Sequence, residues 1–385
     1  MKRKKFVLIS GFNIHDNNRG TAALSYGAIS FLKEKKYLEN NQILVNFRVV
    51  KNLFKHRNRG CIKELISTAD GDWYHLTYNV FFIEIILFTR FGILLPFSTF
   101  GKAMSQIELV AAINGGDGFS DIYGTKTFLY RLHDTNYAIH KGLPLIILPQ
   151  TLGPFQNKTN LVKAEKILKY AKEVYVRDNK FTNELRNINV DFKITKDLSA
   201  FMKPQRWNIK IPKYSVGINI SGLAYSNRFR SLSGQFEQYP ILINEIIKHF
   251  QQKKVPIYLI PHSYCYSKPE EANDDMIACR DAYNKLNDKK GIVFIDMNLT
   301  SPQVKYVISQ MSFFIGTRMH ANFAAIYTGV PVFGLAYSYK FEGAFVANGL
   351  DGIKQTTMIN NLCAEDIPNV INKIENFYQV TINQA

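Results

Sequence analysis

The sequence predicts an α/β protein with two domains, each built on a parallel β-sheet that helices cover. Three observations support this prediction. The chain has 385 residues, which suits two domains of ordinary size. Hydrophobic residues make up 46% of the chain and charged residues 21%, so it can bury large cores and is not mainly disordered. Short apolar runs rich in β-branched residues alternate with longer helical patterns, which is typical of parallel sheets.

The first half of the chain begins with a short apolar run and continues as alternating strands and helices. Several of the strands are apolar without alternation, which indicates that both of their faces are buried. We expect helices at 21–36 and 161–172. The expected strands are 6–10, 43–50, 108–114, 145–149, 174–177 and 192–196.

The second half repeats this plan after a polar, proline-containing stretch at 203–214, which is the expected domain boundary. We therefore expect two Rossmann-like domains, 1–203 and 204–385, that face each other across a cleft. No internal repeat of solenoid length is present. The expected strands are 215–220, 256–260, 292–295, 313–315 and 332–335, and the expected helices are 238–252, 269–287, 302–311 and 318–328.

The segment 80–100 does not fit the alternating pattern. It is apolar for most of its length but is interrupted by Glu84, Arg90 and Pro96. Charges near the centre of a spanning helix cost several kcal/mol each, so we do not expect it to cross a membrane. Two buried helices joined by a turn are the favoured interpretation, and a segment that lies on an anionic membrane surface is the alternative. Basic residues precede the segment, namely Lys51, Lys55, Arg57, Arg59 and Lys63.

The chain is strongly basic. Its 48 Lys and Arg residues exceed its 31 Asp and Glu residues, which gives a formal net charge of +17. Such a chain attracts anions, and these include phosphates, acidic glycans, anionic lipids and nucleic acids. Composition alone does not choose among them.

The N-terminus and the cysteines favour a cytoplasmic protein. Residues 1–5 are basic, but the apolar run behind them, 6–9, is too short for a signal peptide and is expected to be the first strand. The four cysteines are too far apart in sequence for a zinc knuckle or a redox pair, so we expect reduced thiols. They are Cys61, Cys265, Cys279 and Cys363.

The stretch 313–321 has the pattern of an anion-binding site. A short strand ends at Gly316, Thr317 is expected to cap a helix, and the free amides at the helix start favour an anion. Arg318 can donate two hydrogen bonds to a phosphate or carboxylate, and His320 lies in the same turn. The alternative is that Arg318 and His320 are surface residues at a helix end.

Five other strand ends carry polar residues. The loop after the strand 108–114 contains Gly115, Gly116 and Asp117, whose glycines allow a ligand close approach and whose carboxylate can accept from sugar hydroxyls. Turn geometry is the alternative for this loop. The other candidates are Asn18 in the loop 10–24, Gln150 at 148–155, Arg177 beside Asp178, for which a structural salt bridge is the alternative, and His262 after the strand 256–260.

The segments around these residues, taken together, resemble the polysaccharide pyruvyl transferase family. The chain departs from the family at Thr21 and Ala22, where members often carry an acidic pair. Each motif is short, but six in the right order rarely arise by accident. The six are Asn18 with Gly20, Gly115 to Asp117, 148–155, 176–178, Arg318 with His320 and Ala321, and Pro331 to Tyr337 followed by Lys340.

This resemblance implies a GT-B-like fold and a reaction in which phosphoenolpyruvate forms a pyruvate ketal on two hydroxyls of a sugar. It ties Arg318 and His320 to phosphoenolpyruvate, which is a substrate, so no cofactor is implied. We expect Arg177, Lys340 and Arg228 to add positive charge. His320 is expected to protonate the enol, Asp117 to accept a hydroxyl proton, and His262 to act as a second acid or to contact the acceptor. His133 and His140 lie seven residues apart, so we expect no metal site there.

Two other functions compete with this one. The nearest is a GT-B glycosyltransferase whose basic residues hold a nucleotide-sugar diphosphate. The other is a non-enzymatic protein that binds an anionic ligand or nucleic acid, but the basic residues are dispersed and no nucleic-acid-binding motif is evident, so we expect no nucleic acid. The net charge also suits a lipid-linked sugar acceptor, with peripheral contact at the inner face of the membrane.

Overall fold

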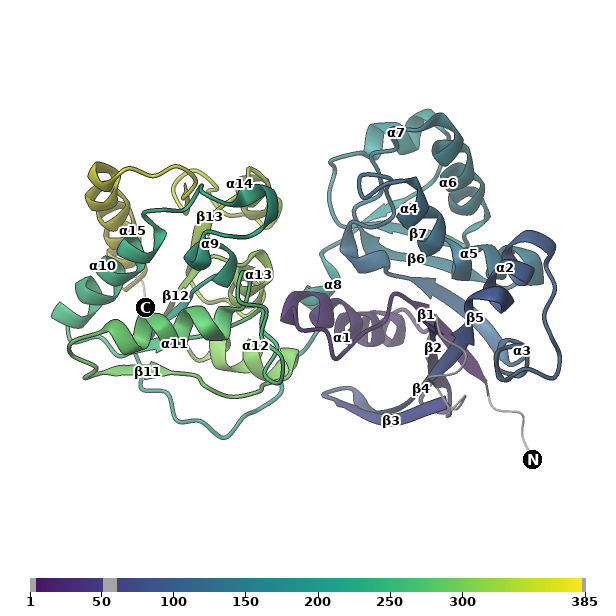
Figure 1. The fold of residues 1–385 in the computed structure, drawn as a ribbon, viewed down its shortest axis with the longest axis horizontal. Coiled ribbons are helices and arrows are strands. Elements are labelled where there is room, and N and C mark those ends of the chain that lie inside the picture. Colours follow the sequence, from purple (N-terminus) through teal and green to yellow (C-terminus); the bar gives the residue numbers. More distant parts are fainter. Residues whose placement is uncertain (1–4, 51–60, 383–385) are drawn as a thin grey trace. The chain divides into compact units, whose positions relative to one another are not determined.

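The computed structural model describes residues 5–50 and 61–382 and divides the chain into two compact units. The first unit comprises Met1–Ile14 and Leu24–Lys203, and the second comprises His15–Ala23 and Pro204–Ala385. Each unit has its own sheet and its own apolar core (Figure 1). The short segment His15–Ala23, which the sequence-based division places in the first domain, thus makes its contacts with the second unit.

The first sheet has eight strands in the order β3-β4-β2-β1-β5-β6-β7-β8. All neighbouring strands are parallel except β3 and β4, which form an antiparallel pair at one edge. The strands are β1 (Phe6–Ser10), β2 (Ile43–Val50), β3 (Cys61–Thr68), β4 (Gly71–Phe81), β5 (Ile107–Ala112), β6 (Leu145–Gln150), β7 (Glu173–Val176) and β8 (Lys193–Ile194).

Burial explains which of these strands the sequence predicts well. Every residue of β1 and β6 is buried, as expected for central strands covered on both faces. The hairpin of β3 and β4 was not predicted, because β3 is an edge strand whose side chains are mostly exposed or half-buried. The expected strand at 192–196 is only two residues long, and both residues are exposed.

The helices of the first unit cover the sheet on both faces (Figure 1). Phe88, Phe128 and Tyr137 are among the core residues that they contribute. The helices are α1 (Arg19–Glu34), whose first residues belong to the second unit, α2 (Phe82–Phe91), α3 (Thr99–Met104), α4 (Thr125–Arg131), α5 (His133–Lys141), α6 (Lys158–Tyr170), α7 (Thr182–Asn187) and α8 (Leu198–Phe201).

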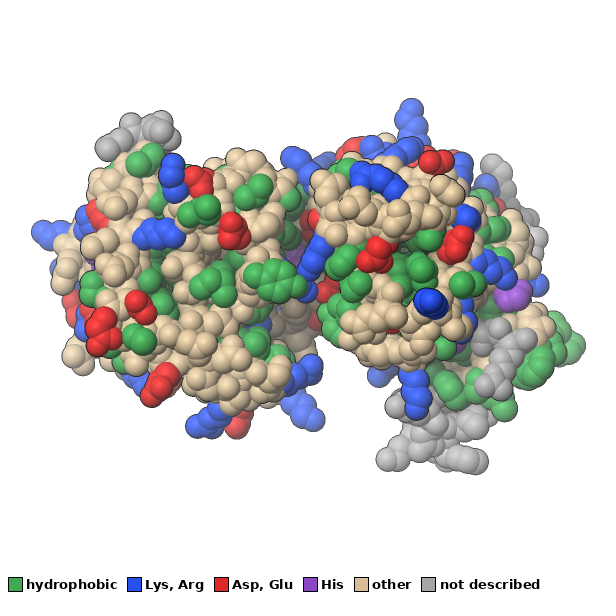
Figure 2. Space-filling model, turned by 90° about the horizontal axis from the view of Figure 1, so that it is seen from above, with side chains coloured by type: hydrophobic (Ala, Val, Ile, Leu, Met, Phe, Trp, Pro, Cys, Tyr) green, Lys and Arg blue, Asp and Glu red, His purple; other side chains and the backbone are tan. Residues whose placement is uncertain are grey.

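The segment 80–100 is a helix, a turn and the start of a second helix, but it is not buried as we expected. Helix α2 ends at Gly92, which has a left-handed backbone, and large apolar side chains on the helix and in the turn are exposed. Figure 2 shows hydrophobic side chains gathered at this end of the first unit. Glu84, which interrupts the apolar run, is buried and accepts from the backbone amide of Phe81 at 3.2 Å. Lys51, Lys55, Arg57 and Arg59 lie outside the described residues, and Lys63 is in β3.

The second sheet has six strands in the order β11-β10-β9-β12-β13-β14, and all neighbours are parallel. The chain adds strands on one side of β9 up to β11 and then on its other side from β12 onwards. Open parallel sheets bind ligands at the carboxyl edge at such a switch point, here between β9 and β12. The strands are β9 (Val216–Asn219), β10 (Ile257–Leu259), β11 (Ile292–Phe294), β12 (Phe313–Gly316), β13 (Val332–Ala336) and β14 (Thr356–Met358). The last of these was not predicted.

Helices pack against both faces of this sheet. The ring of Phe250 lies 5.1 Å from that of Tyr378, and both contact Phe313 of the central strand. The helices are α9 (Gly222–Ser226), α10 (Tyr239–Gln252), α11 (Asp275–Lys285), α12 (Ser301–Ser309), α13 (Met319–Ile326), α14 (Lys340–Ala347) and α15 (Ile367–Ile382). The predicted α/β class with two parallel sheets is therefore confirmed. In the part of the chain that the structure describes, no helix has the length and apolarity needed to span a bilayer.

We predict that Gly27→Ala lowers the free energy of unfolding by about 2 kcal/mol or more, because overpacking typically costs 1–3 kcal/mol. A β-carbon on Gly27 of α1 would lie only 1.9 Å from the carbonyl oxygen of Leu198 in α8. Gly343→Ala is the matched control, since nothing lies within 4 Å of its added carbon in α14, and it is expected to stabilise by roughly 0.5–1 kcal/mol. Equal chemical denaturation midpoints for the two variants would contradict this packing.

Candidate functional site

The turn from β12 into α13 places the start of a helix, which has no side-chain cap, at the carboxyl edge of the second sheet. A side chain at position 316 has no room, because a β-carbon on Gly316 would lie 2.1 Å from Oδ1 of Asn322. The expectation that Thr317 caps α13 is wrong. Arg318 occupies the N-cap position, and the buried hydroxyl of Thr317 hydrogen-bonds the hydroxyl of Tyr239 at 2.7 Å. The helix start is thus left open for an acceptor, which favours an anion.

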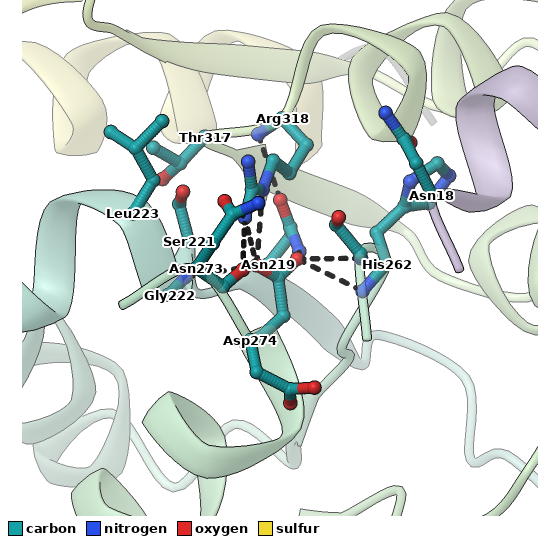
Figure 3. Close-up of polar contacts among 12 residues, drawn as sticks. Asn18, Asn219, Ser221, Gly222, Leu223, His262, Asn273, Asp274, Thr317 and Arg318 are labelled. Carbon is teal, nitrogen blue, oxygen red and sulfur yellow. Dashed lines mark hydrogen bonds and ion pairs between the residues drawn. The ribbon is translucent and has the colours of Figure 1, made fainter. Parts of the chain in front are cut away.

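The guanidinium of Arg318 is held in one position by four hydrogen bonds (Figure 3). Its Nε and Nη2 donate to Oδ1 of Asp275 at 3.0 and 2.7 Å. Its Nη2 also donates to the backbone oxygen and Oδ1 of Asn273, at 2.7 and 2.8 Å. These contacts use Nε and Nη2 but not Nη1. Arg318 can therefore donate to a ligand from Nη1, but it cannot bind the ligand with two parallel hydrogen bonds.

The carboxylate of Asp275 joins this turn to three other segments. It is fully buried at the first position of α11. Besides Arg318, its Oδ1 accepts from the amide of Gly222 at 2.8 Å. Its Oδ2 accepts from the amides of His262 and Ser263 at 3.1 and 2.9 Å. Because a buried charge is tolerated only when it is paired and hydrogen-bonded, these contacts are interdependent.

Two neighbours of Asp275 complete this network. The side-chain oxygen of Asn219, at the end of β9, accepts from the backbone amide of Arg318 at 2.8 Å, and its Nδ2 lies 3.3 Å from Asp275. Asp274 is the N-cap of α11 and accepts from the amides of Met276 and Ile277. One aspartate therefore stabilises the helix start while the next one reaches into the site.

His262 lies in this network as a buried, neutral imidazole. Burial lowers its pKa well below the ordinary value, and positive charge at His320, Arg19 and Arg318 lowers it further. Its Nδ1 is buried and has no hydrogen-bond partner among the described residues. Figure 3 shows its ring beside Asn18. Burial is the larger cause of the low pKa, and the three nearby cationic side chains act in the same direction.

The loop that contains Asn18 and Gly20 packs against both histidines. A β-carbon on Gly20 would lie 2.6 Å from Cβ, Cγ and Nδ1 of His320, so only glycine fits there. The Oδ1 of Asn18 accepts from the amide of Gly20 at 2.9 Å, and the amide of Arg19 donates to the carbonyl of His262 at 3.0 Å. We expected this loop at the edge of the first sheet, whereas these contacts are within the second unit.

Arg19, which we did not predict, anchors this loop. It is buried, and its Nε donates to the carbonyl of Leu299 at 2.8 Å, while its Nη2 donates to Oδ1 of Asn298 at 3.0 Å. The guanidinium also lies 4.1 Å from the centre of the Tyr264 ring. These partners are neutral, so the positive charge of Arg19 adds to the potential at His262.

A second group of predicted residues meets at the carboxyl edge of the first sheet. Arg177 donates to Asp197 at 2.7 Å and to the hydroxyl of Thr151 at 3.0 Å. Asp178, the expected partner in its alternative structural role, lies farther away, at 3.7 Å. A β-carbon on Gly116 would lie 3.0 Å from Nη1 of Arg177. Asp117 is half-buried and accepts from the hydroxyl of Tyr123 at 2.9 Å. Gly115 is exposed and has a positive φ of 70°.

The remaining predicted residues are not joined to either group by these contacts. Gln150 is fully buried, and its amide donates to the carbonyls of Ala112 and Leu148 at 2.8 and 3.2 Å. Lys340 begins α14 and is exposed, as is Arg228. Their roles as ligands of the substrate stay predictions.

The first sheet also places an unusual carboxyl group at its edge. Asp134 lies in the first turn of α5, next to Ser10 at the end of β1. Burial raises the pKa of Asp134 to about 6, while a hydrogen bond from Ser10 acts to lower it. A carboxyl group with such a pKa can give or take a proton near neutral pH. Among residues 5–50 and 61–382, no cluster of three or more His, Cys, Asp or Glu could hold a metal ion.

Solved structures define the class of this architecture. UDP-GlcNAc 2-epimerase from Methanocaldococcus jannaschii has a TM-score of 0.55 at 10% identity, covering 98% of this chain and 93% of that one. A putative UDP-N-acetylglucosamine 2-epimerase from Listeria monocytogenes has a TM-score of 0.56 at 11% identity, and the match covers 98% of this chain and 88% of that one. UDP-GlcNAc 2-epimerase from Neisseria meningitidis, bound to UDP-GlcNAc, has a TM-score of 0.50 at 9% identity, and the match covers 98% of this chain and 93% of that one. Such low identities show the fold alone, which is GT-B-like.

The family is defined by sequence. The family model described as polysaccharide pyruvyl transferase matches residues 18–339, so the chain belongs to this family. All the predicted site residues lie within this range except Lys340, which directly follows it. No curated protein sequence matches the chain.

We predict that Asp275→Asn lowers the free energy of unfolding by roughly 3–5 kcal/mol, because it leaves the buried charge of Arg318 without its counter-charge. Asp296→Asn is the control in the same unit, since its exposed pair with Arg280 is expected to contribute at most about 1 kcal/mol. Urea denaturation of the two variants and the wild type measures both effects. A wild-type midpoint for Asp275→Asn would contradict the organising role of this carboxylate.

The stability of Asp134→Asn is expected to depend on pH. The folded state raises the pKa of Asp134 from 3.8 to about 6, so ionisation above that pH costs folding energy. The cost is absent below pH 4 and complete above pH 6, and the neutral amide avoids it. At pH 8 the variant is expected to be more stable than the wild type by on the order of 2 kcal/mol, and at pH 4 equally stable. Thermal melts at both pH values, with exposed Asp191→Asn as the control, test this; a gain that does not depend on pH would contradict it.

Proposed function

We propose that the protein transfers the pyruvyl group of phosphoenolpyruvate to two hydroxyls of a sugar, which forms a cyclic ketal and releases phosphate. Membership of the polysaccharide pyruvyl transferase family supports the transferase class and a polysaccharide-related acceptor. The observation that carries the proposal is the uncapped start of α13, where Arg318 is held by Asp275 and Asn273, His320 lies in the same turn, and the Arg19 loop packs against both His320 and His262.

This site has the chemistry that the donor requires. Phosphoenolpyruvate carries a phosphate and a carboxylate on one small enol, so it needs several fixed cations and donors. Helix amides and Nη1 of Arg318 can hold one anionic group, and the positive charge of Arg19 favours the other through space. We place the methylene carbon of the enol beside His320.

The reaction balances as follows. His320 gives a proton to the methylene carbon, and the double-bond electrons form the new C–H bond, which leaves a cationic centre at the phosphate-bearing carbon. A sugar hydroxyl attacks that carbon and loses its proton. The C–O bond to phosphate then breaks, phosphate leaves with the electron pair, and the second hydroxyl attacks and loses its proton. A positioned general acid typically contributes roughly 100- to 10,000-fold to such a step.

The other predicted residues have supporting roles in this proposal. Asp117 accepts a hydroxyl proton of the sugar, and the glycines Gly115 and Gly116 let the acceptor approach the backbone. Lys340 and Arg228 add positive charge, and Asn18 contacts substrate. Arg177 is paired with Asp197 and Gln150 is completely buried, so these two residues act indirectly, by holding this edge of the first sheet in place.

The acceptor in this proposal is a sugar of a cell-surface or capsular polysaccharide, or of its lipid-linked precursor. A reaction that consumes phosphoenolpyruvate suits the cytoplasm and, for a lipid-linked acceptor, the inner face of the membrane. A glycosyltransferase with a nucleotide-sugar donor is the second candidate, since the fold resembles that of an epimerase bound to UDP-GlcNAc. Thermal shifts with phosphoenolpyruvate and with UDP-GlcNAc separate the two candidates, because a ligand stabilises the state that it binds.

We predict that His320→Ala and Arg318→Lys each reduce phosphate release from phosphoenolpyruvate by roughly 100-fold or more, in the presence of a galactose- or mannose-type acceptor. His320→Ala removes the proton donor, and lysine cannot reproduce the four bonds of Arg318. Exposed His140→Ala and Arg280→Lys are the controls and are expected to keep wild-type rates. Turnover near the wild-type rate in both site variants would remove the proposed mechanism.

A further inference from the structure

Large apolar side chains that are normally buried are exposed together on α2 and in the loop that follows it. Phe97 is 89% exposed, Phe91 65% and Ile83 61%, and Phe82, Ile93 and Leu95 are also exposed. We call these six residues the α2 surface. Soluble proteins rarely expose so much contiguous apolar area unless it binds something.

The helix is built to present this face and to hold it firmly. Ile83, Leu87 and Phe91 are spaced by four residues and therefore lie along one side of α2. The opposite side is anchored in the core of the first unit, where Phe88 packs 5.1 Å from the ring of Tyr137 and 6.4 Å from that of Phe100. The exposed face is therefore part of an ordered helix.

The loop extends the same surface. The amide of Gly92 donates to the carbonyl of Phe88 at 2.8 Å, and the left-handed backbone of Gly92 ends the helix there. The chain then exposes Ile93, Leu95 and Phe97 before Ser98 caps α3. Alternate residues of the loop thus point apolar side chains to solvent.

The sequence around this surface is basic and lacks acidic residues. Between Glu84 and Glu108 there is no Asp or Glu, whereas Arg90 and Lys102 are present. Between Glu39 and Glu64 there are six basic residues and again no acidic one. The strand β2, within this second stretch, pairs with β4 up to Phe81, directly before α2. Among the described residues, Lys102 is exposed on α3, directly after the loop, and Lys63 is exposed on β3. Apolar side chains together with such positive charge match an anionic lipid bilayer.

We infer that the α2 surface docks the protein on the headgroup region of an anionic bilayer, with Phe91 and Phe97 inserted. A second copy of the chain fits less well, because a symmetric pair would place these basic stretches against each other. The membrane contact itself does not depend on the proposed function. Only its biological role, which is to bring the enzyme to a lipid-linked acceptor, rests on that function.

Co-sedimentation with vesicles tests this surface. We use vesicles of phosphatidylcholine with 30% phosphatidylglycerol, and pure phosphatidylcholine as the neutral reference. The wild type is expected to bind the anionic vesicles. The double variant Phe91→Ser/Phe97→Ser is expected to bind them with an affinity that is lower by about tenfold or more. Ile353→Ser, which removes a 70% exposed side chain in the second unit, is the matched control and is expected to bind as the wild type does.

Three outcomes would overturn the inference. Wild-type protein that stays in solution, or a double variant that sediments equally, removes the α2 surface as a lipid contact. Light scattering that shows a wild-type dimer and a monomeric double variant assigns the surface to a second copy. Phosphate release with a water-soluble acceptor is measured on the same preparations. If the double variant loses vesicle binding but keeps this activity, the two proposals succeed separately; if activity is absent in the wild type too, only the proposed function fails.

Discussion

The geometry of the second unit's site depends on one buried carboxylate. Asp275 accepts hydrogen bonds from the start of α9, from the loop after β10 and from Arg318, and its solvation is replaced entirely by these donors. A shift of any of these segments would remove a donor from a buried charge, which costs more than the loss of a neutral hydrogen bond. The position of Arg318, and with it that of the turn into α13, is therefore fixed before any ligand arrives. Preorganised donors of this kind bind and stabilise developing charge without reorganisation.

The same carboxylate explains why the site needs more than one cation. Asp275 balances the charge of Arg318, so this pair alone would offer an anion little net attraction. Yet the pKa of His262 is lowered by positive charge from His320 and Arg19 as well as by burial. Arg19, whose partners are carbonyl and amide oxygens, is the source that no nearby carboxylate is shown to neutralise. The loop of Asn18 to Gly20 thus contributes the positive charge of Arg19, and Gly20, which has no side chain, leaves room for the ring of His320.

The sequence predicts the parts of this arrangement that are local. The strand at 313–316, its glycine and the helix behind it follow from a pattern of nine residues, and the buried runs of β1 and β6 are recognisable because both of their faces are apolar. Asp275 was not recognised, because it lies 43 positions before Arg318 and only the tertiary fold brings the two together. An aspartate pair before a helical pattern indicates a cap, which is the role of Asp274, but gives no sign that Asp275 points inwards. Likewise, the apolar composition of 80–100 fits a buried and an exposed helix equally well, and only the packing of Phe88 shows which face is covered.

The proton balance of the proposed reaction distinguishes His262 and Asp134, whose pKa values are both shifted by burial. One proton is added to carbon, but two are lost from the sugar hydroxyls. His320 can take back one of these after it has protonated the enol, and the departing phosphate can carry the other. His262 is a poor proton acceptor chiefly because it is buried, and the positive charge of His320, Arg19 and Arg318 adds to that effect. A bound trianion would offset the charge but not the burial, so His320 remains the better proton carrier of the two. Asp134, in α5 of the first unit, owes its raised pKa to burial, so a pH dependence that belongs to it is expected in the free protein without any ligand.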